Sequence, residues 1–500
     1  MNLAALILTA ALQLIPAPVE WTPAEGNVRE GAKVCWTKTG RPFRDLEPWQ
    51  REEAYRITLT PRRIRVEYAS PAGRRRAAAS LQQLGGQVPC GELFDYPRFR
   101  HRGLMIDESR SFKGIPFLKK QIDAMALLKL NVLHLHLTDS AGWRIEIKSR
   151  PQLTAKTAYR IGWDYFAWEA GKYRFTTADD PDGSGGYYTR DELRELVAYA
   201  AERHITVIPE IEMPGHSMEV GYAYPDVLCT TPDGRVCTGA WDLCPGSEAT
   251  FALLEDVLGE VMDIFPGPYI HLGGDEATMK TWAQCPKCRS RMEAEGLGEV
   301  KELQGYLMRR VASFVHGRGR RIIGWDEILD TGVPQEAVVQ SWRGTAGGER
   351  ASRMGHDVIL SPSSHCYLNY YQDLIRKEPK ATGTLTSLHW CYDYEPVGEG
   401  MDAARVLGLQ GNLWCEYIPT PAHAEYMLYP RLFAIAETGW SPSGKKDYED
   451  FRERARRLLG ALKQKGYEGF DMDGESELAR SPWNNFPDYE KHRHDDTSLH

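Results

Sequence analysis

The sequence contains no apolar run long enough to cross a membrane. A transmembrane helix needs about 18 to 20 mostly apolar residues in succession, and the longest candidate, Leu3 to Leu12, is followed by Gln13 and then Pro16. Long basic runs are also missing, and the formal net charge is −8 at pH 7. The chain therefore lacks the electrostatic footprint of a protein that binds nucleic acid or an anionic membrane surface, and we expect a neutral partner.

Cysteine is sparse, with ten residues in a chain of 500. That number is too low for a fold built on disulfides. Cys285 and Cys288 have the spacing of half a zinc site, but no second Cys-x-x-Cys or His-x-x-x-His pair follows nearby. We interpret the pair as a local disulfide or two plain thiols, and we expect no metal site.

Tryptophan, in contrast, is frequent, with 14 residues. Hydrophobic residues make up 42% and charged residues 26% of the chain, which describes a folded protein and excludes the disordered and fibrous classes. The length fits one barrel of roughly 300–400 residues with a smaller domain attached. Flat indole surfaces beside polar groups suit the stacking of sugar rings, and a tryptophan-rich core is the alternative.

Residues 1–97 predict a small N-terminal α/β domain. Tyr55–Leu59 and Ile64–Tyr68 are strand-like runs around a turn, and the segment Gly73–Leu84, rich in Ala and Arg, is helical. Residues 1–11 are similar to a short secretory segment, although no Lys or Arg precedes the apolar stretch. We expect a secreted or periplasmic protein, with a cytoplasmic location as the alternative.

Residues 98–470 repeat one pattern: a short apolar run, a polar loop and, usually, a helix. Eight such units predict a closed (β/α)8 TIM barrel of the α/β class. An open, doubly wound sheet would need a Gly-rich phosphate-binding turn or a break in the repeat, and the sequence has neither. Residues 471–500, rich in Asp, Glu, His and Pro, predict a C-terminal tail. The eight runs are Gly103–Ile106, Val132–Leu137, Ile205–Ile208, Tyr269–Leu272, Arg321–Gly324, Val338–Ser341, Val358–Leu360 and Val406–Leu409.

Polar and aromatic side chains follow these runs, and in (β/α)8 enzymes the working residues lie at the C-terminal ends of the strands. Such a mixture suits a neutral, polyhydroxylated substrate, because it offers hydrogen bonds to hydroxyl groups, flat faces for sugar rings and an acid for a leaving oxygen. In strand order the candidates are Arg110, Asp139, His216, Asp275 with Glu276, Trp325, Trp342, Tyr367 with Asn369, and Trp414 with Glu416.

The most informative motif is Gly273-Gly274-Asp275-Glu276. Its two glycines allow a close approach of backbone and ligand, and two adjacent carboxylates in different environments have pKa values that move apart, so that one can stay protonated as an acid. A glycine-rich turn with two solvated acids is the alternative, but the position directly after an apolar strand favours catalysis. A pair formed by Asp139 and His216 would orient such an acid, although a single His is more often structural.

Two histidines on the second strand suggest a competing function. His134 and His136 lie on one face of that strand, and this pattern is typical of metal-dependent amidohydrolases. That chemistry also needs His after strands five and six, where Trp325 and Trp342 stand instead. We therefore prefer to interpret both as core or hydrogen-bonded histidines and keep the amidohydrolase as an alternative.

Taken in order, these motifs resemble glycoside hydrolase family 20, the β-N-acetylhexosaminidases. The resemblance covers the barrel from residue 98 to about 439, and residues 12–90 are more weakly similar to the small α/β domain that precedes the barrel in this family. The motifs that carry it are His101–Arg110, His134–Asp139, Pro209–His216, His271–Glu276, Trp325, Trp342, Tyr367–Asn369 and Trp414–Glu416.

The resemblance implies hydrolysis with retention and with the substrate's own 2-acetamido oxygen as the nucleophile, which forms an oxazolinium intermediate. It makes Glu276 the general acid/base. It implies that Asp275 orients the acetamido nitrogen and that the Tyr367 hydroxyl binds the acetamido oxygen. Asp139 and His216 would tune Glu276.

The same resemblance assigns the binding residues. Trp325, Trp342 and Trp414 would form a box around the acetamido methyl group and the sugar face. Arg110 and Glu416 would hold hydroxyl groups of the terminal sugar, which makes the enzyme exo-acting. We thus expect removal of terminal, non-reducing β-linked GlcNAc or GalNAc from amino-sugar-terminated glycans, without a metal or organic cofactor.

The sequence departs from the family pattern in three places. Ser111 stands where a His often follows the Arg, and Ser140-Ala141 replaces an acidic and amide pair after the second strand. Asn369 occupies a position often held by Asp, which affects how the O4/O6 side of the sugar is recognised and would relax rejection of charged substituents. A non-catalytic carbohydrate-binding barrel is the remaining alternative, and both a homodimer and a monomer stay open.

Overall fold

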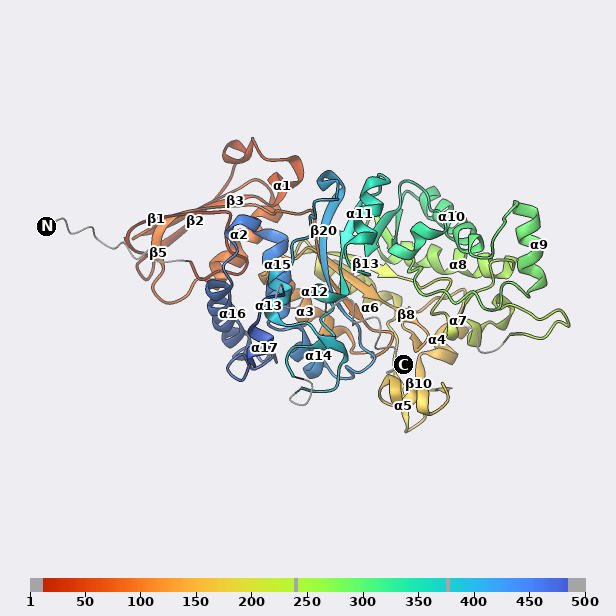
Figure 1. Ribbon diagram of the computed structural model, residues 1–500. Coiled ribbons are helices and arrows are strands. Elements are labelled where there is room, and N and C mark those ends of the chain that lie inside the picture. Colours follow the sequence, from red (N-terminus) through yellow and green to blue (C-terminus); the bar gives the residue numbers. More distant parts are fainter. Residues whose placement is uncertain (1–11, 238–241, 375–377, 484–500) are drawn as a thin grey trace.

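A computed structural model describes residues 12–237, 242–374 and 378–483. The chain forms an N-terminal sheet domain followed by a larger barrel with its surrounding helices (Figure 1). The expected secretory segment, residues 1–11, lies outside the described residues, as do residues 484–500 of the expected tail. In the described part of the chain, no helix is both long enough and apolar enough to span a bilayer.

The N-terminal domain is a five-stranded sheet with the order β1-β5-β3-β4-β2. The predicted strands and helix are present as β3, β4 and α2, whereas β1, β2 and β5 did not stand out in the sequence. Strands β1 and β2 are largely exposed, so they lack the alternation of apolar and polar residues that marks a half-buried strand. The elements are β1 (Glu20–Asn27), β2 (Lys33–Lys38), η1 (Arg41–Phe43), α1 (Pro48–Glu53), β3 (Tyr55–Thr60), β4 (Arg63–Tyr68), α2 (Pro71–Gln83) and β5 (Pro89–Asp95).

The barrel is closed by eight parallel strands in the order β13-β14-β15-β16-β17-β20-β6-β7. All eight predicted runs form these strands, and the predicted (β/α)8 fold class is confirmed. Because both faces of such a sheet are covered, each strand reads as a continuous apolar run. The strands are β6 (His101–Asp107), β7 (Val132–His136), β13 (Thr206–Glu210), β14 (Tyr269–His271), β15 (Arg321–Trp325), β16 (Val338–Ser341), β17 (Val358–Leu360) and β20 (Val406–Leu413).

Long amphipathic helices surround the barrel, and shorter elements extend its loops. Thr189 and Glu192 form the predicted capping box at the start of α6, where each side chain accepts a hydrogen bond from the backbone of the other. The larger helices are α3 (Ile115–Leu127), α6 (Arg190–Ala201), α8 (Glu248–Ile264), α9 (Pro286–Glu295), α10 (Glu302–Gly317), α11 (Ala346–Arg353), α14 (Pro421–Leu428), α15 (Arg431–Trp440) and α16 (Tyr448–Lys463).

The loop elements are short. The helices are α4 (Gln152–Thr157), α5 (Tyr165–Ala170), α7 (Met218–Ala223), η2 (Pro225–Val227), η3 (Asp326–Asp330), α12 (Ser363–Cys366), α13 (Leu388–Asp393), η5 (Ala403–Arg405), η6 (Ser443–Lys445) and α17 (Glu477–Arg480). The strands are β8 (Thr138–Asp139), β9 (Gly142–Trp143), β10 (Tyr159–Ile161), β11 (Phe175–Thr176), β12 (Gly183–Gly185), β18 (Tyr370–Tyr371) and β19 (Thr382–Leu385).

Buried charges join the N-terminal domain to the barrel. One oxygen of Glu53 accepts hydrogen bonds from Arg76 Nε and Arg102 Nη2, each at 2.6 Å, and both guanidinium groups are buried. Asp95, at the end of β5, accepts from Lys129 Nζ at 2.7 Å and from Trp440 Nε1 at 2.8 Å. The Trp440 ring, at the end of α15, belongs to the apolar core of the N-terminal domain, so a helix that follows the last barrel strand completes that core.

The first residues of the expected tail are ordered against the barrel. Helix α17 contacts α13, and the carbonyl groups of Arg480 and Ser481 accept hydrogen bonds from His389 Nδ1 and Trp390 Nε1. Ser476 N donates to Asp373 at 2.9 Å. The described part of this segment is thus packed rather than extended from the barrel.

Candidate active site

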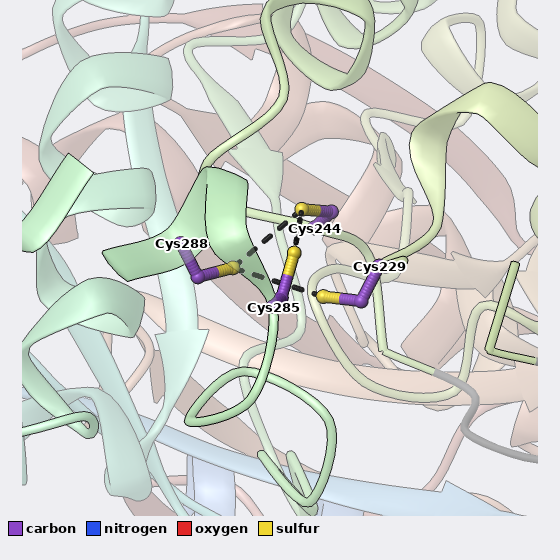
Figure 2. A group of neighbouring side chains, drawn as sticks. All are labelled: Cys229, Cys244, Cys285 and Cys288. Carbon is purple, nitrogen blue, oxygen red and sulfur yellow. Dashed lines mark hydrogen bonds between the residues drawn. The ribbon is translucent and has the colours of Figure 1, made fainter. Parts of the chain in front are cut away.

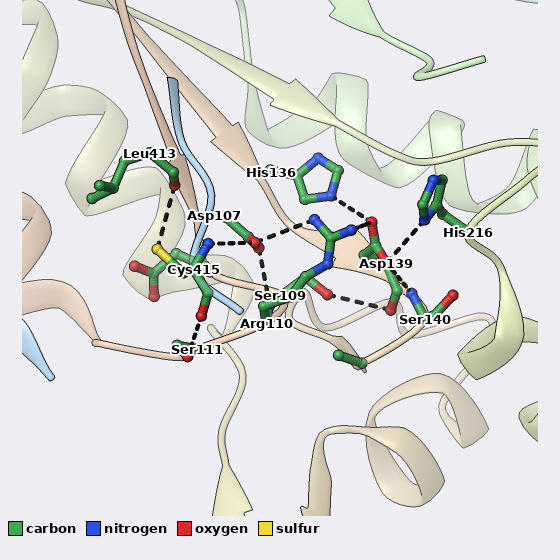
Figure 3. A network of polar contacts seen from close by, with 12 residues as sticks. Asp107, Ser109, Arg110, Ser111, His136, Asp139, Ser140, His216, Leu413 and Cys415 are labelled. Atoms are coloured by element: carbon green, nitrogen blue, oxygen red, sulfur yellow. Dashed lines mark hydrogen bonds and ion pairs between the residues drawn. The ribbon is translucent and has the colours of Figure 1, made fainter. Parts of the chain in front are cut away.

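An ion-pair network forms the base of the barrel mouth, where β6 and β7 end (Figure 3). Arg110 lies between two carboxylates, with Nη2 2.8 Å from Asp139 Oδ2 and Nη1 3.2 Å from Asp107 Oδ2. Burial alone would lower the pKa of Arg110, but Asp139, Asp107 and then Glu416 outweigh it and raise that pKa well above its ordinary value. The guanidinium group is therefore a fixed positive charge, and its carbon lies 5.0 Å from the centre of the Trp414 ring.

Asp139 connects this network to the carboxylates of the glycine motif. Its Oδ1 lies 3.4 Å from His216 Nδ1, and His216 Nε2 lies 3.2 Å from Glu276 Oε2. Burial would raise the pKa of Asp139, but Arg110 and His216 hold it well below its ordinary value. Burial would likewise lower the pKa of His216, and Asp139 together with Glu276 raises it well above 6.5. The raised pKa favours the protonated form of His216, which forms a hydrogen bond to Glu276 and an ion pair with Asp139.

Asp275 and Glu276 lie side by side in different environments, as the motif predicted. The side chain of Asp275 is 13% exposed and that of Glu276 is 58% exposed. Burial raises the pKa of Asp275, whereas the hydrogen bond from His216 lowers that of Glu276. The pKa values thus move apart, but in this unliganded geometry the raised one belongs to Asp275 and not to the expected acid, Glu276.

The two glycines of the motif are required by backbone geometry and by space. Gly273 has φ +64° and Gly274 has φ +97°, both in the region that disfavours other residues. A Cβ atom on Gly273 would lie 1.9 Å from a carboxyl oxygen of Glu212, and one on Gly274 would lie 2.6 Å from Ile328 Cγ2. Glu212 Oε1 accepts a hydrogen bond from Gly274 N at 3.0 Å, so this buried side chain supports the turn that presents Asp275 and Glu276.

Four aromatic residues from strand ends five to eight form one cluster. Trp325, Tyr367 and Trp414 are buried together, and Trp342 packs against them as a partly buried residue. The ring of Trp342 stacks on that of Tyr367 at 6.1 Å with an interplanar angle of 17°, and the rings of Trp325 and Trp414 lie 5.8 Å apart. The structure therefore brings together the residues expected to form the aromatic box.

The two remaining candidates, Glu416 and Asn369, are less connected. Glu416 lies close enough to Arg110 to raise its pKa, and burial raises the pKa of Glu416 itself. One carboxyl oxygen of Glu416 and the amide oxygen of Asn369 are buried without a hydrogen-bond partner among the described residues. No described hydrogen bond joins the Asn369 side chain to the other candidates.

Two further carboxylates at the mouth were not singled out from the sequence. Burial, followed by the charge of Asp275, raises the pKa of Glu327 to about 9, and Trp342 Nε1 donates a hydrogen bond to it at 3.0 Å. Glu212 is fully buried, and burial with Asp275 raises its pKa well above 4.5. Both follow directly after strands, at positions where polar residues were already expected, and this position is the signal that could have identified them.

The strand histidines surround a single buried carboxylate. Glu210 lies 2.9 Å from His134 Nε2 and 2.9 Å from His271 Nδ1, and it also contacts His136 Nδ1. Trp325 Nε1 donates to it at 2.9 Å. These histidines and Glu210 could approach a metal ion, but all are fully buried, and the rings of His134 and His271 pack against Trp325. The group is a hydrogen-bonded core and offers a substrate no open ligand position.

Comparisons with known proteins agree with this geometry. The model of "Glycosyl hydrolase family 20, catalytic domain" matches residues 99–443. A β-hexosaminidase of Porphyromonas gingivalis is 42% identical over 375 residues, which cover 73% of this chain and 46% of that protein. A β-hexosaminidase of Akkermansia muciniphila is 34% identical over 503 residues and covers 95% of both chains. The crystal structure of an exo β-N-acetylglucosaminidase from Vibrio harveyi in complex with N-acetylglucosamine has a TM-score of 0.80 at 30% identity and covers 92% of this chain and 78% of that chain.

The relatives differ in length. The chain spans 46% of the Porphyromonas gingivalis protein and 65% of a Vibrio furnissii β-hexosaminidase to which it is 39% identical. The family match over residues 99–443 contains the residues of the barrel mouth described above.

Proposed function

This chain belongs to glycosyl hydrolase family 20, and we propose that it is an exo-acting β-N-acetylhexosaminidase that removes terminal, non-reducing β-linked GlcNAc or GalNAc from glycans. The β-hexosaminidase names of its relatives support the activity. The observation that carries the proposal is the position of the exposed Glu276 carboxyl beside the buried Asp275, next to a cluster of three Trp and one Tyr.

In the proposed reaction, the substrate's acetamido oxygen attacks C1 while Glu276 donates a proton to the glycosidic oxygen, and the oxazolinium intermediate is then opened by a water molecule that Glu276 deprotonates. Asp275 accepts a hydrogen bond from the acetamido nitrogen and stabilises its developing positive charge. The Tyr367 hydroxyl donates to the acetamido oxygen. The aromatic cluster encloses the acetamido methyl group.

Substrate binding itself prepares the acid. Without a sugar, the hydrogen bond from His216 keeps the pKa of Glu276 low. A terminal sugar over the motif would remove water from the exposed Glu276 carboxyl, and loss of solvation raises the pKa of a carboxyl group. Substrate binding therefore favours the protonated form of Glu276 when the glycosidic oxygen is in place.

Arg110 and Glu416 support exo action in this proposal. Arg110 is held by two carboxylates, and Glu416 keeps one buried oxygen without a partner among the described residues. Both groups are available to bind hydroxyl groups of the last sugar, and Asn369 would complete the O4/O6 side. A secreted or periplasmic location and a homodimer stay predictions, which cell fractionation and light scattering would test.

The test is hydrolysis of p-nitrophenyl β-GlcNAc and β-GalNAc by the full chain. Glu276→Gln removes the proton donor, so we expect kcat to fall by about 10²- to 10⁴-fold. Glu293→Gln changes an exposed carboxyl on α9 and should leave kcat unchanged. A thiazoline analogue of the oxazolinium ion should block the wild-type enzyme.

Two results would contradict the proposal. An unchanged kcat in Glu276→Gln would exclude this residue as the acid. Absence of turnover on both sugars, together with retained binding of the thiazoline, would favour the non-catalytic carbohydrate-binding barrel.

A further inference from the structure

Four cysteines that are distant in the sequence meet at one point beside the barrel mouth (Figure 2). Cys229 follows η2, Cys244 precedes α8, and Cys285 and Cys288 lie at the start of α9. All four are at most 1% exposed. Their sulfur atoms lie within 4.8 Å of one another, so each side chain points at the same small volume.

The spacing of the sulfur atoms is that of a metal tetrathiolate. The distances are 3.7 Å between Cys229 and Cys288, 3.8 Å between Cys244 and Cys285, and 3.5 Å between Cys244 and Cys288. A tetrahedral Zn²⁺ site with Zn–S bonds of about 2.3 Å has sulfur atoms about 3.8 Å apart. The four thiols therefore already lie near the corners of the required tetrahedron.

The surroundings give these sulfur atoms little else to bind. They form a separate apolar cluster with Trp282 and Leu303, and Met279, Met292 and Val300 pack around it. The thiols of the four cysteines form hydrogen bonds to one another. Buried thiols are common by themselves, but four thiols that converge on one point are the donor set of a tetrahedral metal site.

One of the four thiols is prepared to be a thiolate. Cys285 is the N-cap of α9, a helix of 10 residues, and a helix N-terminus stabilises negative charge.

We propose that Cys229, Cys244, Cys285 and Cys288 bind one structural Zn²⁺ ion. All four positions of the tetrahedron are filled by protein, so the site has no open position for a substrate and does not take part in the chemistry. This differs from the interpretation of Cys285 and Cys288 as a disulfide or plain thiols, because the other two ligands come from 41 to 59 residues earlier in the chain.

The zinc would fasten the two loops that carry the acid and its partner. Cys229 and Cys244 lie in the loop after β13, which also contains His216, and Cys285 follows Glu276 in the loop after β14. The same loops are joined by Asp242, which accepts hydrogen bonds from Thr278 N at 3.1 Å and Met279 N at 2.7 Å. The ion thus stabilises the arrangement of His216 and Glu276 from outside the mouth.

A pair of disulfides is the competing arrangement. A disulfide needs two sulfur atoms about 2.05 Å apart and one partner for each, whereas Cys244 is nearly equidistant from Cys285 and Cys288. The described cysteines are all free thiols in the structure.

The experiment measures metal content and free thiols of the untagged, full-length chain after dialysis in metal-free buffer. Mass spectrometry of the metals should find one zinc per wild-type chain and none in Cys285→Ser/Cys288→Ser. Cys391→Ser, which changes a fully buried thiol elsewhere in the fold, should keep one zinc. Denatured wild-type protein should show all ten cysteines as free thiols without added reductant.

Replacement of zinc by Co²⁺ gives a readout that does not depend on activity. A tetrathiolate cobalt site has intense visible absorption and a sulfur-to-cobalt charge-transfer band, and both should be present in wild type and Cys391→Ser. Because both bands are measured in wild type and Cys391→Ser, this test does not depend on whether Cys285→Ser/Cys288→Ser folds. Three results would overturn the proposal. They are a free-thiol count in denatured protein that is four lower than expected, iron in place of zinc, and wild-type protein without bound metal.

Discussion

The turn that presents Asp275 and Glu276 offers a quantitative test, because a matched control glycine exists. Gly273 has φ +64° and Gly296, at the end of α9, has φ +66°. A Cβ atom on Gly273 would lie 1.9 to 2.1 Å from the carboxyl group of Glu212, whereas one on Gly296 would meet nothing within 4 Å. Alanine at either position has the same backbone strain, and only Gly273→Ala adds a collision.

The two contributions can be estimated separately. Left-handed backbone costs a non-glycine residue about 1–2 kcal/mol, which is the whole expected loss of unfolding free energy for Gly296→Ala. In Gly273→Ala the Glu212 carboxyl must move, and its hydrogen bond from Gly274 N is lost in a buried place. An unsatisfied buried group costs about 1–3 kcal/mol, so the total should be about 2–5 kcal/mol.

The assay combines urea unfolding with hydrolysis of p-nitrophenyl β-GlcNAc. Displacement of the turn by about 1 Å can cost roughly 100-fold in rate, so we expect Gly273→Ala to lose at least about 10-fold in kcat, whereas Gly296→Ala should keep the wild-type rate. Equal losses of stability in the two variants, or full activity in Gly273→Ala, would refute the argument that Glu212 sets the turn.

Two further predictions concern buried charge. Burial would raise the pKa of Glu53, but Arg102 and Arg76 lower it below 4.5. The stabilisation from Glu53 is therefore present above pH 4.5 and is lost as the pH falls through the folded-state pKa. Glu53→Gln should lower the free energy of unfolding by about 3–5 kcal/mol at pH 7 and by less at pH 3, as measured by urea unfolding at both pH values. Asp139→Asn should lower the pKa of His216 and weaken its hydrogen bond to Glu276, which raises the pKa of the Glu276 carboxyl. The basic limb of the pH profile of kcat/KM should then move to higher pH. An unchanged profile would contradict the argument that Asp139 acts on Glu276 through His216.

The barrel could be predicted from the sequence because each strand is covered on both faces and therefore reads as an apolar run. The strands β1 and β2 were missed because their residues are mostly exposed. Residues at the mouth could be found by their position after a strand, which identified Asp139 and His216. The expected pairing of these two residues is present as a contact of 3.4 Å, because β7 and β13 are neighbouring strands of the barrel and the loops that follow them lie at the same end.

The pKa values of the two carboxyls and the cysteine cluster also depend on contacts between loops. The sequence predicted that the pKa values of Asp275 and Glu276 differ, but the sign depends on the hydrogen bond from His216, which only the structure shows. Cys285 and Cys288 are neighbours in the sequence, whereas Cys229 and Cys244 reach them only through loop geometry. Spacing along the chain therefore underestimates sites that are built from several loops.

The hydrogen bond between Trp440 and Asp95 spans 345 residues of sequence, and this has a consequence for synthesis on the ribosome. At roughly 5–20 residues per second, the sheet domain emerges about 20 to 70 seconds before the helix that closes its core. During that interval Tyr55, Ile57 and Leu93, which are buried in the finished protein, have no α15 to cover them. The nascent domain therefore reaches its final packing only after the barrel has been translated.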